Sequence, residues 1–226
     1  STTTKPFYSR KIMKEFRYTF VTEGSSDRAL MPILTWLLRE NGIQMAIQPE
    51  WADLGEVRFS EKVNLAAKIR ESIRLYPCDL LFVHRDADTF SREKRKEEIL
   101  EAVSNAGNDI HVPSAVCVVP IRMQEAWLLI DEEAIRYAAG NRNGRHKLDM
   151  PPIHKLEGLA DPKSLLHDLL KVASGFSGRR LKRFNSNQSH AVQRIASYIE
   201  DFSILRNLPA FSALEAELVD EISLFL

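Results

Sequence analysis

Two uninterrupted apolar runs constrain the fold of this chain more than any other feature. They are LLFV at residues 80–83 and AVCVV at residues 115–119, and neither contains a polar side chain that would face water. Strands of this kind are typical of parallel sheets, because helices cover both faces of such a sheet. The chain is therefore expected to belong to the α/β class.

Strand and helix patterns alternate over the first part of the chain. Strands are predicted in four places, of which the second is weakened by Pro49: 16–21, 43–54, 79–83 and 115–119. Helices are predicted to follow them, the first capped by Ser25 or Ser26: 30–38, 61–75, 91–106 and 124–139. This alternation predicts a Rossmann-like parallel sheet of about four strands, flanked by helices and joined by right-handed crossovers.

The remainder of the chain has a different pattern. Residues 140–162 contain three glycines and three prolines, which is typical of a loop. Beyond it the apolar spacing predicts three helices and no strand, around 165–170, 192–199 and 211–222. We therefore expect an α/β core over 1–139, followed over 140–226 by a loop and an all-helical C-terminal extension packed on the core.

Composition excludes some classes of protein. Hydrophobic residues make up 44% and charged residues 27% of the 226 residues, which is typical of a globular protein and excludes global disorder. The net charge is +0, so attraction to nucleic acid must come from local patches. No apolar stretch approaches the ~18–20 residues of a membrane span, and the first residues lack the apolar segment of a signal peptide. A cytoplasmic protein is expected.

Acidic residues follow the first and third predicted strands. Glu23 comes after the first strand, and Asp86 and Asp88 come after the third. Ligands of open α/β sheets bind at the carboxyl ends of the strands, so on adjacent strands these carboxylates can share one ion. Mg²⁺ suits such a site because it prefers hard oxygen ligands. Taken singly, each residue fits a helix cap or a turn equally well.

The combination of these acidic residues resembles the Toprim family, the metal-dependent catalytic fold of topoisomerases, bacterial primases and several nucleases. The resemblance covers residues 16 to about 130 and rests on Glu-Gly after the first strand and Asp-x-Asp after the third. It implies that Glu23 is a general acid/base or metal-bridging residue and that Asp86 and Asp88 bind metal. It further implies that Asp27 is a candidate ligand of a second metal. Topoisomerase and primase activities are not expected, because the chain lacks a strand-passage domain and zinc-ribbon cysteines.

The segment PIRMQEAWLL at residues 120–129 is similar to the region after the last core strand in small stand-alone Toprim-like proteins. Those proteins are often encoded beside an ATPase in bacterial antiphage systems. The likeness implies that Glu125 is another metal ligand, although a helix dipole also favours an acidic residue in the first turn. It implies Mg²⁺ or Mn²⁺ as cofactor and an ATPase as partner, since this chain has no ATP-binding motif of its own.

A basic cluster without acidic neighbours predicts a nucleic-acid-binding surface. Four of the five residues 179–183 are basic, namely Arg179, Arg180, Lys182 and Arg183. Arg and Lys provide most contacts to backbone phosphates, although a charged run can also be a solvated helix face. A cation near the metals would also stabilise charge on a phosphate, and Lys163 qualifies by type alone. His84 is more often a near-core residue than a ligand.

Together these features predict a metal-dependent phosphodiesterase, or nuclease, that acts on DNA or RNA as the effector of an antiphage defence system. Two alternatives remain open. The first is a catalytically silent Toprim-like module that binds nucleic acid or a partner and regulates it. The second is a phosphatase or phosphotransferase that uses Asp86 as nucleophile, which is disfavoured because such enzymes usually carry the motif on their first strand.

Overall fold

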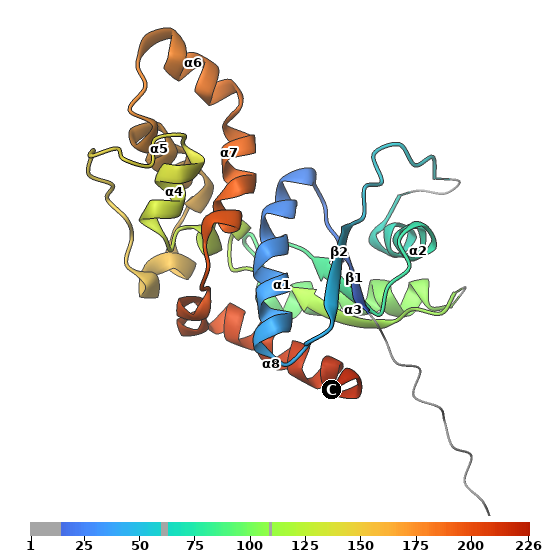
Figure 1. The fold of residues 1–226 in the computed structure, drawn as a ribbon. Helices are drawn as coiled ribbons and strands as arrows, with labels where there is room; N and C mark the ends of the chain where they lie inside the picture. Colours follow the sequence, from blue (N-terminus) through green and yellow to red (C-terminus); the bar gives the residue numbers. More distant parts are fainter. Residues whose placement is uncertain (1–14, 60–62, 109) are drawn as a thin grey trace, which may run out of the picture.

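A computed structural model describes residues 15–59, 63–108 and 110–226. Its centre is a four-stranded sheet in which all neighbouring strands are parallel, in the order β2-β1-β3-β4 (Figure 1). The strands are β1 (Glu15–Val21), β2 (Ala46–Trp51), β3 (Leu80–His84) and β4 (Ser114–Val118). The α/β class and the parallel sheet of four strands flanked by helices are confirmed.

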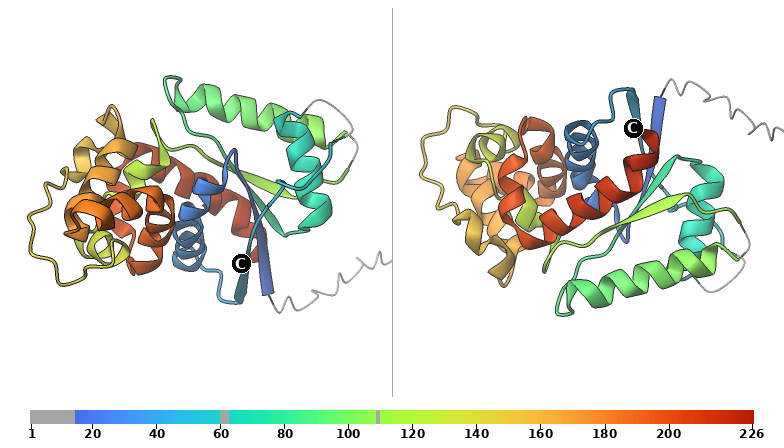
Figure 2. Two further views of the ribbon diagram at one scale, coloured as in Figure 1. Left: turned by 90° about the horizontal axis from the view of Figure 1, so that it is seen from above. Right: turned by 90° about the horizontal axis from the view of Figure 1, so that it is seen from below.

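Helices cover both faces of the sheet, which explains the uninterrupted apolar strands. Helices α1 (Met31–Glu40) and α8 (Pro209–Ile222) lie on one face, and α2 (Leu65–Leu75) and α3 (Arg92–Ala106) lie on the other (Figure 2). Phe82 of β3 and Tyr18 of β1 belong to the apolar cluster with α1 and α8, whereas Leu81 and Val83 of β3 belong to the cluster with α2 and α3. All five residues of β3 are buried. The partly exposed edge strand β2 accommodates Pro49, since an edge strand has fewer ladder hydrogen bonds to lose.

Four further helices form a lobe beside the sheet, which we call the helical lobe: α4 (Glu132–Ala138), α5 (Pro162–Ser174), α6 (Gly178–Ser186) and α7 (Gln188–Ile195) (Figure 1). Helix α5 packs on the short helix η2 (Gln124–Leu128) that follows β4, and α7 packs on η1 (Ser25–Leu30) that follows β1. The helical lobe is therefore anchored at the carboxyl edge of the sheet. Because α4 packs on both α5 and α7, a single apolar cluster extends from the sheet into the lobe. The division at residue 139 stays a prediction.

Several element boundaries differ from the sequence prediction. The expected first helix is divided, because residues 25–30 form the 3-10 helix η1, with Gly24 as its N-cap in place of Ser25 or Ser26. The expected helix over 124–139 is also divided, since the Asp131 side chain accepts a hydrogen bond from Ala134 N and starts a new helix there. Helix α6 was not predicted, and residues 61 and 62 of the second predicted helix lie outside the described residues.

Three further short helices connect these elements in the described residues: η3 (Ile153–Gly158), η4 (Ala196–Tyr198) and η5 (Ser203–Asn207). A last one, η6 (Ser223–Phe225), follows α8. The edge strand β4 is fixed by α8, because Glu217 Oε1 accepts the Cys117 backbone N–H at 2.8 Å while Lys96 Nζ of α3 lies 2.6 Å from Glu217 Oε2. In the described part of the chain, no helix has the length and apolar character needed to cross a membrane.

The packing of α1 on the sheet predicts a large effect at Leu34, whose side chain is 0% exposed. Leu34→Ala is expected to lower the free energy of unfolding by about 2–5 kcal/mol, because it removes buried methyl groups and leaves a cavity. Urea-induced unfolding followed by circular dichroism measures the change. The matched control is Leu224→Ala, since Leu224 is 87% exposed. Equal losses in the two variants would contradict the described core.

Candidate functional site

Three segments that leave the sheet at its carboxyl edge form the candidate site. Val21 of β1 lies opposite Val83 of β3, and Val83 lies opposite Cys117 of β4, so the chain leaves all three strands at similar height. The residues that follow are η1 after β1, Asp86 after β3 and η2 after β4. The first and third strands are therefore adjacent, as a shared ion requires.

Asp27 is held in a buried position by η1 and η2. Asp27 is only 7% exposed. Oδ2 accepts the backbone N–H of Gly24 at 3.1 Å, and Oδ1 accepts the Ser26 hydroxyl at 3.1 Å and the Gln124 side-chain amide Nε2 at 2.9 Å. The first two bonds are local to η1, whereas the third joins the segment after β1 to the segment after β4.

His84, the last residue of β3, lies between two carboxylates. Its Nδ1 donates to the Val118 carbonyl oxygen at 3.0 Å, because a carbonyl only accepts. Its Nε2 lies 3.8 Å from Asp27 Oδ2 and 3.6 Å from Asp86 Oδ1. Burial lowers the pKa of His84 more than the Asp27 charge raises it, so the ring is neutral and Nε2 carries a lone pair.

Asp86, which follows β3, has a strongly raised pKa. Its Oδ1 accepts the Gln124 backbone N–H at 2.9 Å. Burial is the largest of the causes that raise the pKa of Asp86 to about 8, and the negative charges of Glu125 and Asp27 are the next. In the absence of a cation, Asp86 therefore shares its site unfavourably with these two carboxylates.

Glu125 is the third acid of the site and is buried, with only 4% exposure. Burial raises the pKa of Glu125, and the charges of Asp27 and Asp161 raise it further. Lys163 on α5 lowers it, so a cation of the helical lobe acts directly on this site. We refer to Asp27, Asp86 and Glu125 together as the acidic group.

The structure places the two other predicted carboxylates outside the acidic group. Glu23 has a side chain 53% exposed, and its Oε1 lies 2.9 Å from Arg85 Nη2. The Asp88 side chain is 49% exposed, with Oδ2 3.4 Å from Arg95 Nη2 and a left-handed backbone φ of 52°. Both predicted residues therefore face solvent at the same edge and are paired with arginines.

A cavity of about 470 Å³ opens beside Glu23. Its wall includes Trp51 at the end of β2 and Lys68 on α2. The Trp51 indole donates to Thr22 Oγ1 at 3.0 Å, which fixes the ring at the carboxyl edge. Space for a ligand therefore lies directly next to one of the predicted catalytic residues.

The acidic group fits a divalent cation by its donor chemistry. It offers hard oxygen atoms, which Mg²⁺ and similar cations prefer as ligands. Gln124 Oε1 is also buried and finds no hydrogen-bond partner among the described residues. Over those same residues, no three His, Cys, Asp or Glu side chains already surround one point closely enough to hold a metal ion.

Sequence reasoning gave two residues of this site too little weight. It favoured a near-core role for His84 over a role as a ligand; His84 is buried, and its Nε2 also lies 3.8 Å from Asp27 and 3.6 Å from Asp86. Gln124 received no role, although its position next to Glu125 was the available signal. Neither residue belongs to a recognisable spacing, because both contacts arise from the parallel pairing of β1, β3 and β4.

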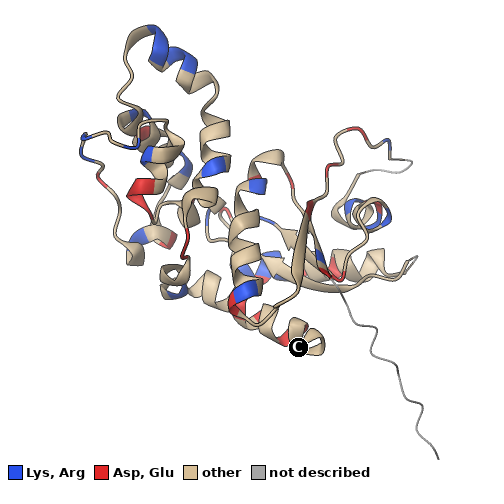
Figure 3. Cartoon of the chain, viewed as in Figure 1, with Lys and Arg blue, Asp and Glu red and all other residues tan. Residues whose placement is uncertain are grey.

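The predicted basic cluster lies on α6 at the tip of the helical lobe (Figure 3). All its members, Arg179, Arg180, Lys182 and Arg183, are exposed. Within the described part of the chain they form no ion pair with a carboxylate. The cluster is therefore available to an anionic ligand, as the sequence suggests.

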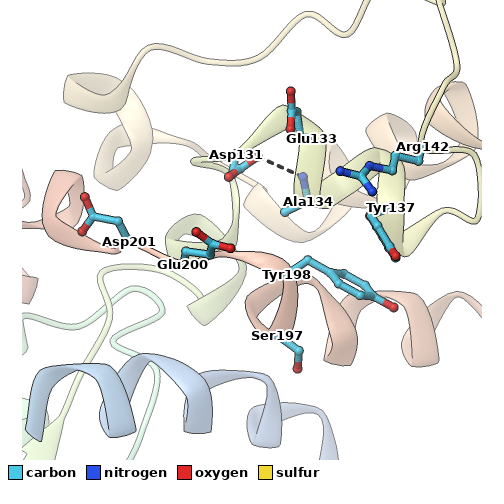
Figure 4. Close-up of a pocket in the computed structure, with 9 residues that line it drawn as sticks. All are labelled: Asp131, Glu133, Ala134, Tyr137, Arg142, Ser197, Tyr198, Glu200 and Asp201. Carbon is cyan, nitrogen blue, oxygen red and sulfur yellow. Dashed lines mark hydrogen bonds between the residues drawn. The ribbon is translucent and has the colours of Figure 1, made fainter. Parts of the chain in front are cut away.

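A second cavity, of about 600 Å³, lies within the helical lobe (Figure 4). The rings of Tyr137 and Tyr198 stack there with centroids 4.3 Å apart, and Arg142 lies over Tyr137. The remaining charged residues of its wall are acidic: Asp131, Glu133, Glu200 and Asp201. Such a lining repels phosphate, and the cavity contains none of the predicted site residues.

The raised pKa of Asp86 predicts a pH-dependent stability in metal-free buffer. Asp86 keeps its proton in the folded protein up to about pH 8, whereas the unfolded chain loses it near pH ~3.9. The stability that comes from this retained proton is fully present below about pH 4. As the pH rises further, the free energy of unfolding falls by up to about 1.4 kcal/mol per pH unit until about pH 8. Asp86→Asn removes this titration, so the variant should gain stability relative to wild type as the pH rises.

Urea unfolding at a series of pH values in EDTA measures this difference. The control is Asp149→Asn, because the Asp149 side chain is 84% exposed and its replacement should leave the pH profile unchanged. A stability difference between Asp86→Asn and wild type that stayed constant with pH would show that the pKa of Asp86 is not raised.

In comparisons with known proteins, no family model, no curated protein and no solved structure matches this chain.

Proposed function

We propose that the chain is a divalent-cation-dependent phosphodiesterase that cleaves DNA or RNA. The observation that supports this most is the gathering of three carboxyl groups at the carboxyl edge of a parallel sheet, where Asp27 and Glu125 are buried and the Asp86 side chain is only 25% exposed. Such crowding is unfavourable without a cation and favourable with one. The Toprim resemblance implies the same chemistry at this edge.

In this proposal Asp86, Asp27 and Glu125 hold Mg²⁺ or Mn²⁺. A cation bound there supplies activation of water and neutralisation of charge on a phosphate oxygen. The backbone and side-chain N–H groups of Gln124 keep Asp86 and Asp27 oriented, and His84 Nε2 lies 3.6 and 3.8 Å from the same two residues. These residues position the ligands, whereas the exposed carboxylates would meet the substrate.

Glu23 and Asp88 are the residues proposed for that substrate-facing role. Arg85 contacts Glu23 on one side and Glu98 on the other, at 2.9 and 2.8 Å, and so fixes the Glu23 carboxylate beside the 470 Å³ cavity. A fixed carboxylate next to a ligand space suits a general acid/base, which is the role that the resemblance implies for Glu23.

The basic surface of α6 supports a polymeric, phosphate-rich substrate. The helical lobe that carries it is anchored on η1 and η2, the two segments that provide Asp27 and Glu125. Gln193 Nε2 of α7 donates to the Ser25 carbonyl at 3.3 Å and is part of this anchoring. A nucleic acid held by α6 would thus be bound by a lobe that packs directly on the segments of the acidic group.

A silent binding module is the second candidate function, and one observation favours it. The carboxylates of Glu23 and Asp88 are both neutralised by arginines, as expected where no cation is bound in the working state. Nucleic-acid or partner binding would then depend on α6 alone. An ATPase partner, a role in antiphage defence and a cytoplasmic location are implied by the resemblance and stay proposals for either function.

The enzymatic proposal predicts metal-dependent cleavage of plasmid DNA or of bulk tRNA by the purified protein. Cleavage should require Mg²⁺ or Mn²⁺ and stop in EDTA. Glu23→Gln and Asp86→Asn should each reduce the rate by about 10²-fold or more, because each removes a group that acts on the reacting phosphate or its cation. The control is Asp149→Asn, the same replacement of a carboxylate by an amide at an exposed position, which should cut like wild type.

A folded wild-type protein that cuts neither polymer with either metal would contradict the enzymatic proposal. The same holds if Glu23→Gln and Asp86→Asn both stay folded and cut as well as wild type. Binding of the polymer without cutting would favour the silent module.

The basic cluster predicts sequence-independent binding that weakens with salt. Replacing Arg179, Arg180, Lys182 and Arg183 together by Gln should lower affinity equally for unrelated oligonucleotides. The negative slope of log K against log salt concentration should become less steep by up to ~3.6, because each of four lost phosphate contacts contributes ~0.9. Fluorescence anisotropy over a series of salt concentrations measures both effects.

The control is Arg74→Gln, an exposed arginine of α2 that is paired with Glu71. An unchanged salt slope in the quadruple variant would exclude α6 as a phosphate-binding surface.

A further inference from the structure

Gln124 connects two carboxylates of the acidic group. It is the first residue of η2 and only 2% exposed. Its backbone N–H donates to Asp86 Oδ1 at 2.9 Å, and its side-chain Nε2 donates to Asp27 Oδ1 at 2.9 Å. Gln124, which follows β4, therefore contacts the acid that follows β3 and the acid that follows β1.

The other end of the Gln124 amide has no partner. Oε1 is buried and accepts no hydrogen bond from any described residue. The amide orientation follows from chemistry, because the Asp27 carboxylate oxygen accepts and must face the NH₂ group. Buried amide oxygens without a donor are costly and rare, so this atom needs a ligand that the chain itself does not provide.

The surroundings of Oε1 favour a cation over a hydrogen-bond donor. Oε1 shares its carbon with Nε2 and so lies beside the Asp27 carboxylate. Further carboxyl oxygens lie close by, because Asp86 accepts the backbone N–H of Gln124 and Glu125 is the neighbour of Gln124 in the chain. Amide carbonyl oxygens are ordinary ligands of hard divalent cations, alongside carboxylates.

We propose that Gln124 binds the divalent cation of this site through Oε1, as a neutral oxygen ligand beside Asp27, Asp86 and Glu125. The inference rests on the proposed function, because it names a further ligand of the same cation. It gives Gln124 two roles, since its two N–H groups orient Asp27 and Asp86 while its oxygen completes the set of ligands. This residue is not among the carboxylates that the sequence singles out.

The test is the binding of Mn²⁺ alone to the metal-free full chain, measured by isothermal titration calorimetry. Gln124→Met removes both amide atoms at nearly constant volume, and Gln124→Glu keeps an oxygen but loses the donor to Asp27. Gln124→Met should weaken Mn²⁺ binding about tenfold or more, which corresponds to ~1.4 kcal/mol. Gln124→Glu should bind Mn²⁺ at least as tightly as wild type, because it keeps an oxygen ligand.

The matched control is Gln48→Met, the same change at an exposed position of β2, which should bind Mn²⁺ like wild type. Thermal unfolding in EDTA shows which variants are folded. If Gln124→Met does not fold, Gln124→Asn replaces it, because the shorter amide withdraws the oxygen and should also weaken binding about tenfold.

Two results overturn this inference alone. The first is wild-type Mn²⁺ affinity in Gln124→Met or Gln124→Asn while Asp86→Asn has lost binding. The second is equally weak binding in Gln124→Met and Gln124→Glu, which would mean that only the hydrogen bond to Asp27 matters. Both leave the proposed function standing. A wild-type protein that binds no Mn²⁺ overturns the inference and the proposed function together.

Discussion

The parallel pairing of β3 with both β1 and β4 is the constraint on which the rest of this site depends. Because Val83 lies opposite Val21 on one side and Cys117 on the other, the chain leaves the three strands at one edge. The apolar faces of these strands are covered by α1 and α8 on one side and by α2 and α3 on the other, so this edge is where the central strands meet polar groups. Charge is thus concentrated where the sheet ends.

Burial of like charges at that edge needs compensation, and the chain supplies only part of it. Asp27 is satisfied by Gly24, Ser26 and Gln124, whereas Asp86 receives a single backbone N–H and has a pKa raised to about 8. The arginines nearby, Arg85 and Arg95, contact the exposed carboxylates of Glu23 and Asp88. A cation bound by the acidic group would supply the charge that is missing.

The sequence was a good guide to the sheet and a partial guide to the site. Unbroken apolar runs such as residues 80–83 of β3 predict burial on both faces, and periodicity located α1, α3 and α8. It could not show that Asp131 starts a new helix, because capping is decided by local hydrogen bonds. Nor could it place His84 and Gln124 against Asp27, since these contacts join segments that are distant in the chain. Motif position predicted which acids gather at the edge, but not that Glu23 and Asp88 pair with arginines.

The most direct test of the account is anomalous diffraction at the manganese edge from crystals of the protein grown with Mn²⁺. The account predicts an anomalous peak among the side chains of Asp27, Asp86 and Glu125, and none at the acidic wall of the cavity in the helical lobe. A structure with ordered carboxylates at the sheet edge and no peak between them would contradict it. A peak confined to another part of the molecule would do the same.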